Sequence, residues 1–150
     1  MGATFSQILL HVVFSTKGRR AQIKPVCQKR LYEYMGGIVR SGHGVLHTIG
    51  GMPDHVHLLV GWRTDAAVCD LVRDVKSGSS RWVHETFPGL SDFEWQKGYA
   101  VFSVSKSESQ RVSSYIERPL EHHRHRDFAE ELAALLRAHE IEFDARYVVA

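Results

Sequence analysis

The residues best suited to chemistry in this 150-residue chain are His55 and His57, in the stretch MPDHVHLLV at residues 52–60. The apolar residues around them predict a short buried strand. Side chains of a strand alternate between its two faces, so both imidazoles point the same way. Two imidazoles on one face can share a divalent metal ion and leave coordination positions open. A pair of hydrogen-bonded structural histidines is the simpler interpretation of so short a motif.

Tyr115 is the second candidate, and the sequence places it on a helix after the last predicted strand. A phenol titrates near pH 10, so a tyrosine is a weak nucleophile at neutral pH. A nearby divalent metal would polarise a target phosphate and stabilise the charge that develops on its oxygens. Such a site would transfer a phosphodiester onto the tyrosine and leave a free 3′ hydroxyl. Taken alone, Tyr115 would be interpreted as a packing or hydrogen-bonding residue.

The elements that position these residues follow the order strand, helix, strand, strand, helix, strand. Runs of strand formers predict strands at residues 5–15, 45–49, 55–62 and 99–104, and a turn of four or five residues before His55. Helical spacing predicts a helix at residues 26–39, and a second one capped by Thr64 or Asp65. This order is typical of an α+β, ferredoxin-like split βαβ fold (βαββαβ), with a four-stranded antiparallel sheet and both helices on one face. A third layer or a partner must cover the other face.

Residues 106–150 predict C-terminal helices, the first of which carries the tyrosine. Pro119 interrupts that helix, because an interior proline loses a hydrogen bond and clashes with the preceding turn. A second helical segment continues through Phe128 and Leu136, and residues 141–149 are expected to be irregular or extended. We expect one domain over residues 1–150, with a core at 1–105.

Composition and charge narrow the class of protein. Apolar residues make up 43% and charged residues 24% of the chain, and the net charge of +2 is too small to diagnose nucleic-acid binding. Basic residues concentrate at residues 17–40, and acidic residues concentrate after residue 127. This distribution suits a phosphate-rich partner that binds one side of the protein. An ordinary solvated surface is the alternative explanation. The candidate contacts to such a partner are Lys17, Arg19, Arg20, Lys76, Ser77 and Arg81. The segment KSGSSR at 76–81 could equally be a close-packing seam of small residues.

Cys27 and Cys69 form no Cys-x-x-Cys pair, and no zinc-finger spacing is present. With no signal peptide, these features favour a cytoplasmic protein. The longest apolar run, residues 8–14, contains His11 and is too short to span a membrane. His11 is expected to be a core histidine, or a partner to the strand histidines if the two strands are neighbours.

Several motifs occur together in a fixed order over nearly the whole chain. They are LHVVFST at 10–16, GMPDHVHLLV at 51–60, KSGSSRW at 76–82, WQKGY at 95–99, FSVS at 102–105, YI at 115–116, HH at 122–123 and IEFDARY at 141–147. This set resembles the HUH-type single-tyrosine transposases of small bacterial insertion sequences, including their repeat-associated relatives.

The resemblance implies a DNA transposase and single-strand endonuclease. His55 and His57 would bind Mg²⁺ or Mn²⁺, and Tyr115 would cut single-stranded DNA and hold its 5′ end as a phosphotyrosine. Members of the family recognise imperfect hairpins, so single-stranded or hairpin DNA is the expected partner. They are dimers in which the tyrosine helix of one subunit can complete the site of the other, so a homodimer with shared active sites is expected.

The sequence departs from the family at one important position. Members carry a glutamine four residues after the tyrosine as a third metal ligand, and this chain has Pro119 there. His122 is the better substitute by helical spacing, and Glu121 is the better donor for a hard cation. Without either, the chain would be a weakened or domesticated relative that binds hairpin DNA without efficient cleavage. An unrelated RNA-binding module of the same fold is a third hypothesis. Such modules present aromatic residues on the sheet surface, whereas the central strand here presents histidines.

Overall fold

The structure, a computed structural model, describes residues 2–118 and 127–148. The first part of the chain forms β1 (Leu9–Ser15), α1 (Pro25–Ser41), β2 (Val45–Met52), β3 (His55–Gly61), α2 (Val68–Thr86) and β4 (Ala100–Val104). It is followed by α3 (Ser109–Glu117), α5 (Phe128–Ala138) and the short α6 (Ala145–Val148). This order confirms the predicted α+β, βαββαβ fold.

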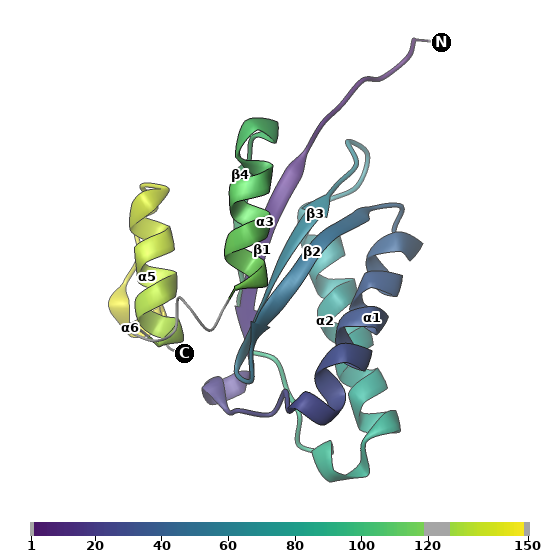
Figure 1. Cartoon of the computed structure of the whole chain (residues 1–150), viewed down its shortest axis with the longest axis vertical. Coiled ribbons are helices and arrows are strands. Elements are labelled where there is room, and N and C mark those ends of the chain that lie inside the picture. Colours follow the sequence, from purple (N-terminus) through teal and green to yellow (C-terminus); the bar gives the residue numbers. More distant parts are fainter. Residues whose placement is uncertain (1, 119–126, 149–150) are drawn as a thin grey trace.

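The four strands form one antiparallel sheet in the order β2-β3-β1-β4. The histidine strand β3 is therefore an interior strand, paired with β2 on one side and β1 on the other. Figure 1 shows α1 and α2 side by side on one side of this sheet. Because helices pack on both faces of the sheet, the side chains of β3 are buried along almost its whole length.

One face of the sheet packs against α1 and α2 and forms the largest apolar core. Val56, Leu58 and Val60 of β3 point into this core. Pro25 occupies the first turn of α1, where its missing N–H costs nothing. The two helices approach closely at Gly78, where a Cβ atom would lie 2.9 Å from Cδ1 of Ile38. This close approach favours the packing explanation for the small residues at 76–81.

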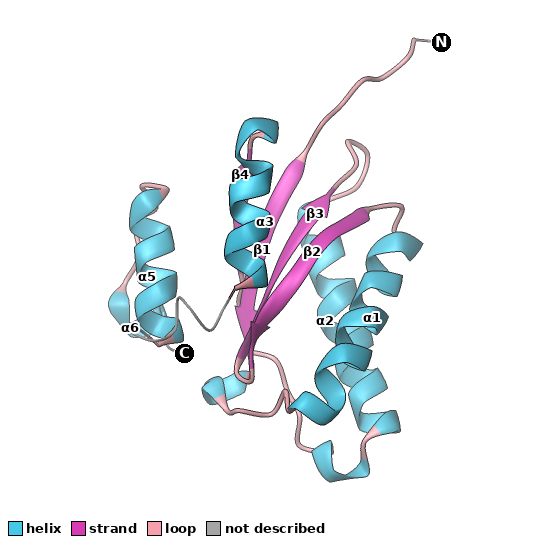
Figure 2. Ribbon diagram, viewed as in Figure 1, coloured by secondary structure: helices cyan, strands magenta, loops and turns pink. Residues whose placement is uncertain are grey.

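The other face is covered by α3 and α5 (Figure 2). Ile116 of α3 packs with Leu9 and Leu59 of the sheet. Phe128 of α5 packs in a second cluster that contains Val13. The third layer that the sequence analysis required is thus supplied by the chain itself.

Three predicted local features were wrong. Met52 pairs with His55, so the β2–β3 turn contains two residues rather than four or five. Neither Thr64 nor Asp65 caps α2, whose N-cap residue is Ala67; the carboxylate of Asp65 instead accepts hydrogen bonds of 2.5 and 2.7 Å from Arg63. Residues 145–148, expected to be irregular or extended, form α6.

Among the residues that the structure describes, no helix combines the length and apolar character needed to cross a membrane.

Gly50 of β2 provides a test of how closely α3 must approach the sheet. A Cβ atom at this position would lie 2.2 Å from the main-chain oxygen of Ile116. A main-chain atom cannot swing aside, so Gly50→Ala should lower the free energy of unfolding by about 1–3 kcal/mol in urea denaturation. Gly89→Ala is the control, because a Cβ there meets nothing within 4 Å. Equal stability of the two variants would contradict this account of the close approach.

Candidate functional site

His55 and His57 lie on the face of β3 that α3 and α5 cover. Their side chains are only 1% and 3% exposed, and their ring centroids are 5.2 Å apart. The alternation of the strand therefore brings the two imidazoles together, as the sequence predicts.

A buried carboxylate, Glu131, completes this group. It is 2% exposed, and its Oε1 lies 2.6 Å from Nε2 of His57. Its Oε2 lies 3.9 Å from Nε2 of His55. Ligand atoms of the three residues all lie within 4.8 Å of one another.

Glu131 reaches the histidines because it lies on the buried face of α5. Asp127 caps this helix by accepting a 2.9 Å hydrogen bond from the main-chain nitrogen of Glu130. Phe128 and Leu132, three residues before and one after Glu131, are buried with it. The sequence analysis counted Glu131 only in an acidic tail. Its position within an apolar helical face was the signal that could have identified it.

Two further groups hold the histidine rings. Oδ1 of Asp54 lies 2.7 Å from Nδ1 of His55, so a proton on Nδ1 leaves the Nε2 lone pair directed toward Glu131. Nε2 of His11 lies 2.8 Å from Nδ1 of His57. Burial, and then the neighbouring His57, lowers the pKa of His11 to about 3, so His11 is a neutral partner at neutral pH. Partners of this kind orient metal-binding histidines in proteins.

Tyr115 lies beside this group in the same chain. Its ring centroid is 5.8 Å from that of His57 and 6.4 Å from that of His11. The hydroxyls of Ser113 and Thr48 are hydrogen bonded and fasten α3 to β2. The helix thus holds the tyrosine next to the histidines of the same chain.

The donor set fits a divalent metal ion. Two imidazole nitrogens and one carboxylate, all buried, are sufficient protein ligands for a site that leaves positions open for a substrate. Of the two expected cations, Mn²⁺ accepts nitrogen ligands more readily than Mg²⁺, which demands oxygen. The other predicted ligands, Glu121 and His122, lie outside the described residues, as does Pro119.

Three of the six predicted DNA contacts lie on α2, on the opposite face of the sheet from this group. The ammonium of Lys76 is held by the main-chain oxygens of Gln96 and Gly98 at 2.5 and 2.9 Å, and burial lowers its pKa. Ser77 and Arg81 are exposed on α2, which covers the opposite face of the sheet. In the basic loop, the cations pair with acidic residues: Lys17 with Glu94, Arg19 with Asp127 and Arg20 with Asp92. Contact of these six residues with DNA stays a prediction.

Comparison with known proteins adds an independent line of evidence. Residues 4–119 match the model of a protein family described as Transposase IS200 like. The match spans both histidines and Tyr115 but ends before α5, so Glu131 lies outside it.

Individual relatives agree with this match. The chain is 26% identical over 116 residues to the ISDra2 transposase TnpA of Deinococcus radiodurans, which covers 74% of this chain and 83% of that protein. A crystal structure of a candidate transposase from D. radiodurans R1 is similar with a TM-score of 0.67 at 25% identity, over 78% of this chain and 94% of that one. A REP-associated tyrosine transposase bound to a REP hairpin has the same fold, with a TM-score of 0.60 at 16% identity, over 82% of this chain and 73% of that one.

The buried His11 should make the metal-free protein sensitive to acid. Its pKa of about 3 in the folded state is lower than the ordinary value of 6.5. The unfolded chain therefore binds the proton more readily, so this contribution to stability is complete above pH 6.5 and falls as the pH drops toward 3. Between neutral pH and about pH 4.5, wild type should lose about 2 kcal/mol more unfolding free energy than His11→Gln. Urea denaturation at both pH values measures this.

The control for this experiment is His47→Gln, which changes an exposed histidine of β2. It should keep the wild-type pH dependence. If His11→Gln also keeps it, the buried imidazole is not the source of the acid sensitivity.

Proposed function

Because the chain belongs to the IS200-like transposase family, we propose that it is a divalent-metal-dependent DNA strand transferase that uses Tyr115 as its nucleophile. One observation carries the proposal: the Tyr115 ring lies beside the buried group of His55, His57 and Glu131 within one chain.

The reaction would move one phosphodiester bond onto the protein. The phenolic oxygen of Tyr115 attacks the phosphorus, and the bond from phosphorus to the 3′ oxygen breaks. The phenol gives up its proton, and the departing oxygen gains one to become a 3′ hydroxyl. The 5′ end is then held as a phosphotyrosine. Because this exchange keeps a phosphodiester bond, attack by another 3′ hydroxyl can rejoin DNA without an external energy source.

His55, His57 and Glu131 would hold the Mn²⁺ or Mg²⁺ ion. When bound, the ion would supply positive charge that stabilises the negative charge on the phosphate oxygens. Asp54 and His11 keep the two imidazoles in orientation. Phe128 packs against the ring of His55 with centroids 4.6 Å apart and shields the group from water.

Single-stranded DNA with a hairpin is the proposed substrate. The REP-associated transposase of the same fold was solved with a REP hairpin, which supports this choice. The resemblance also leads us to expect a homodimer. We infer that an active site can form in cis, since the ring of Tyr115 lies beside the three donors within one chain.

Covalent capture of DNA tests the nucleophile. With Mn²⁺, the wild-type protein should form an adduct with a labelled hairpin oligonucleotide from the DNA that flanks its gene, visible on a denaturing gel. Tyr115→Phe should form none, because it lacks the attacking oxygen, yet should still bind the DNA. Tyr34→Phe, which changes a tyrosine stacked on Trp82 of α2, is the matched control and should still react. An adduct with Tyr115→Phe would refute the assignment.

A second function remains open because Pro119 stands where the family carries a glutamine ligand. In this alternative the chain binds hairpin DNA without cutting it efficiently. Metal-independent binding by wild type with no adduct would favour it over the transferase. The proximity of Glu131 to both histidines favours the transferase, because it offers a third protein ligand in place of the glutamine.

Glu131→Gln tests this carboxylate as a metal ligand. Loss of the charged donor should weaken Mn²⁺ binding at least about tenfold in isothermal titration calorimetry and reduce adduct yield. Glu130→Gln changes the neighbouring exposed carboxylate and should leave Mn²⁺ affinity unchanged. Equal affinities in the two variants would remove Glu131 from the ligand set.

A further inference from the structure

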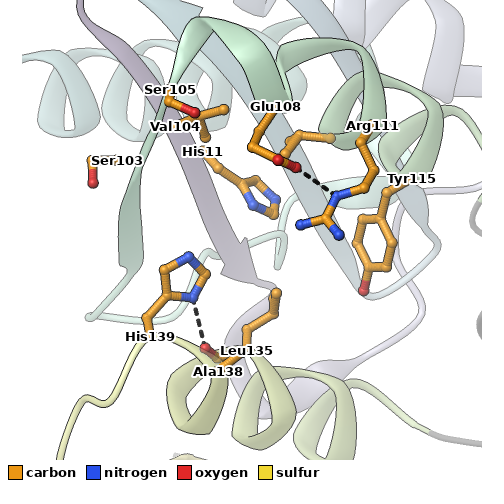
Figure 3. Close-up of a pocket in the computed structure, with 11 residues that line it drawn as sticks. His11, Ser103, Val104, Ser105, Glu108, Arg111, Tyr115, Leu135, Ala138 and His139 are labelled. Carbon is orange, nitrogen blue, oxygen red and sulfur yellow. Dashed lines mark hydrogen bonds and ion pairs between the residues drawn. The ribbon is translucent and has the colours of Figure 1, made fainter.

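A cavity of about 590 Å³ opens beside Tyr115, between α3, the end of β4 and α5. Tyr115 and His11 line it (Figure 3), and His11 in turn contacts His57 of the candidate metal group. Its volume lies within the range of sites that hold small ligands. A substrate phosphate placed at Tyr115 would therefore have this cavity next to it.

The charges around the cavity do not suit a phosphate bound inside it. Arg111 is the only lysine or arginine among the described residues that line it, and its Nε donates to Oε2 of Glu108 over 2.8 Å. This ion pair leaves the cavity close to neutral. A phosphate site in a nucleic-acid-binding protein needs unbalanced positive charge.

The walls of the cavity suit a nucleobase instead. Val112 and Leu135 supply apolar surface for the flat faces of a base. His139 stacks on Phe102 with centroids 4.3 Å apart, and its Nδ1–H donates to the main-chain oxygen of Leu135 over 2.8 Å. The ring is thereby fixed, and in the neutral imidazole Nε2 is an acceptor. Together with the carboxylate of Glu108, the cavity offers acceptors that complement an amino group.

We propose that this cavity receives the unpaired base of the nucleotide adjoining the scissile phosphate, and that it selects bases with an exocyclic amine over thymine. The proposal rests on the transferase function above. In Figure 3 the guanidinium of Arg111 lies between Glu108 and Tyr115, where its other N–H groups can donate to the phosphate that connects this nucleotide to the strand. A base enters such a cavity only when it is out of a helical stack, which gives a physical reason for a single-stranded substrate.

Selection from a pool of sequences tests the proposal by binding alone. The probe is a hairpin oligonucleotide with randomised single-stranded segments on both sides, bound to Tyr115→Phe protein so that no DNA is consumed. The bound fraction should be depleted of thymine at one flanking position by about fivefold or more, the discrimination expected of one good base contact. Ala138→Trp in the same background fills the cavity and should remove the depletion. Ala134→Trp, on α5 but away from the cavity, should keep it.

A second pair of variants tests the acceptor without changing the shape of the cavity. Glu108→Gln should weaken the discrimination against thymine, whereas Glu117→Gln, on α3 outside the cavity, should keep it. Each variant removes one negative charge, and Glu108→Gln also releases Arg111 from its ion pair, so overall affinity for DNA should rise in both and more in Glu108→Gln. The discrimination against thymine is therefore the measurement that distinguishes Glu108→Gln from Glu117→Gln. Uniform base composition at every flanking position, or the same thymine depletion in Ala138→Trp, would overturn the proposal.

These outcomes are distinct from those that test the transferase. If wild type forms the covalent adduct but Ala138→Trp does not alter base preference, the cavity is not a base site and the transferase stands. If the thymine depletion depends on Ala138 and Glu108 but wild type forms no adduct, the cavity binds a base in a protein that does not cut.

Discussion

Glu131 and the two strand histidines are buried together beneath the helices, where an isolated carboxylate would cost several kcal/mol. The 2.6 Å contact between Glu131 and His57 offsets part of this cost, and it requires α5 to lie in one position. Apolar packing supplies that position: Phe128 and Leu132 anchor the same face of the helix in the sheet. The metal-binding geometry thus depends on ordinary hydrophobic burial on either side of one charged group.

The side chains on the two faces of β3 make different contacts. Val56, Leu58 and Val60 stabilise the domain by packing against α1 and α2, while His55 and His57 face α3 and α5. Because side chains alternate, a slip of one residue in the pairing with β1 or β2 would exchange the two sets. The two-residue turn at Pro53 and Asp54 opposes such a slip by fixing where β3 begins. Stability and chemistry are therefore tied to the same register.

Much of this arrangement could be predicted from the sequence, because it follows from periodicity. Alternation placed His55 and His57 on one face, and the order of strands and helices predicted the sheet and the need for a third layer. The apolar face of α5 marks Glu131 as a buried residue, but its contact with the histidines depends on how α5 docks, which no local pattern specifies. The same holds for Asp65, a good capping residue that Arg63 binds instead, and for Lys76, whose cation the main-chain oxygens of a distant loop hold. Tertiary contacts decided each of these cases.

The position of Glu131 along the chain has a consequence for how the protein is made. A ribosome releases β1 to β4 and then Tyr115 before α5 emerges, and the elements of a domain assemble as they become available. Until α5 is synthesised, α3 is the only one of the two helices that covers this face of the sheet, and the carboxylate of Glu131 is not yet beside the histidines. The nascent protein thus contains Tyr115 before Glu131, and the group of two histidines and one carboxylate is complete only when this late helix docks.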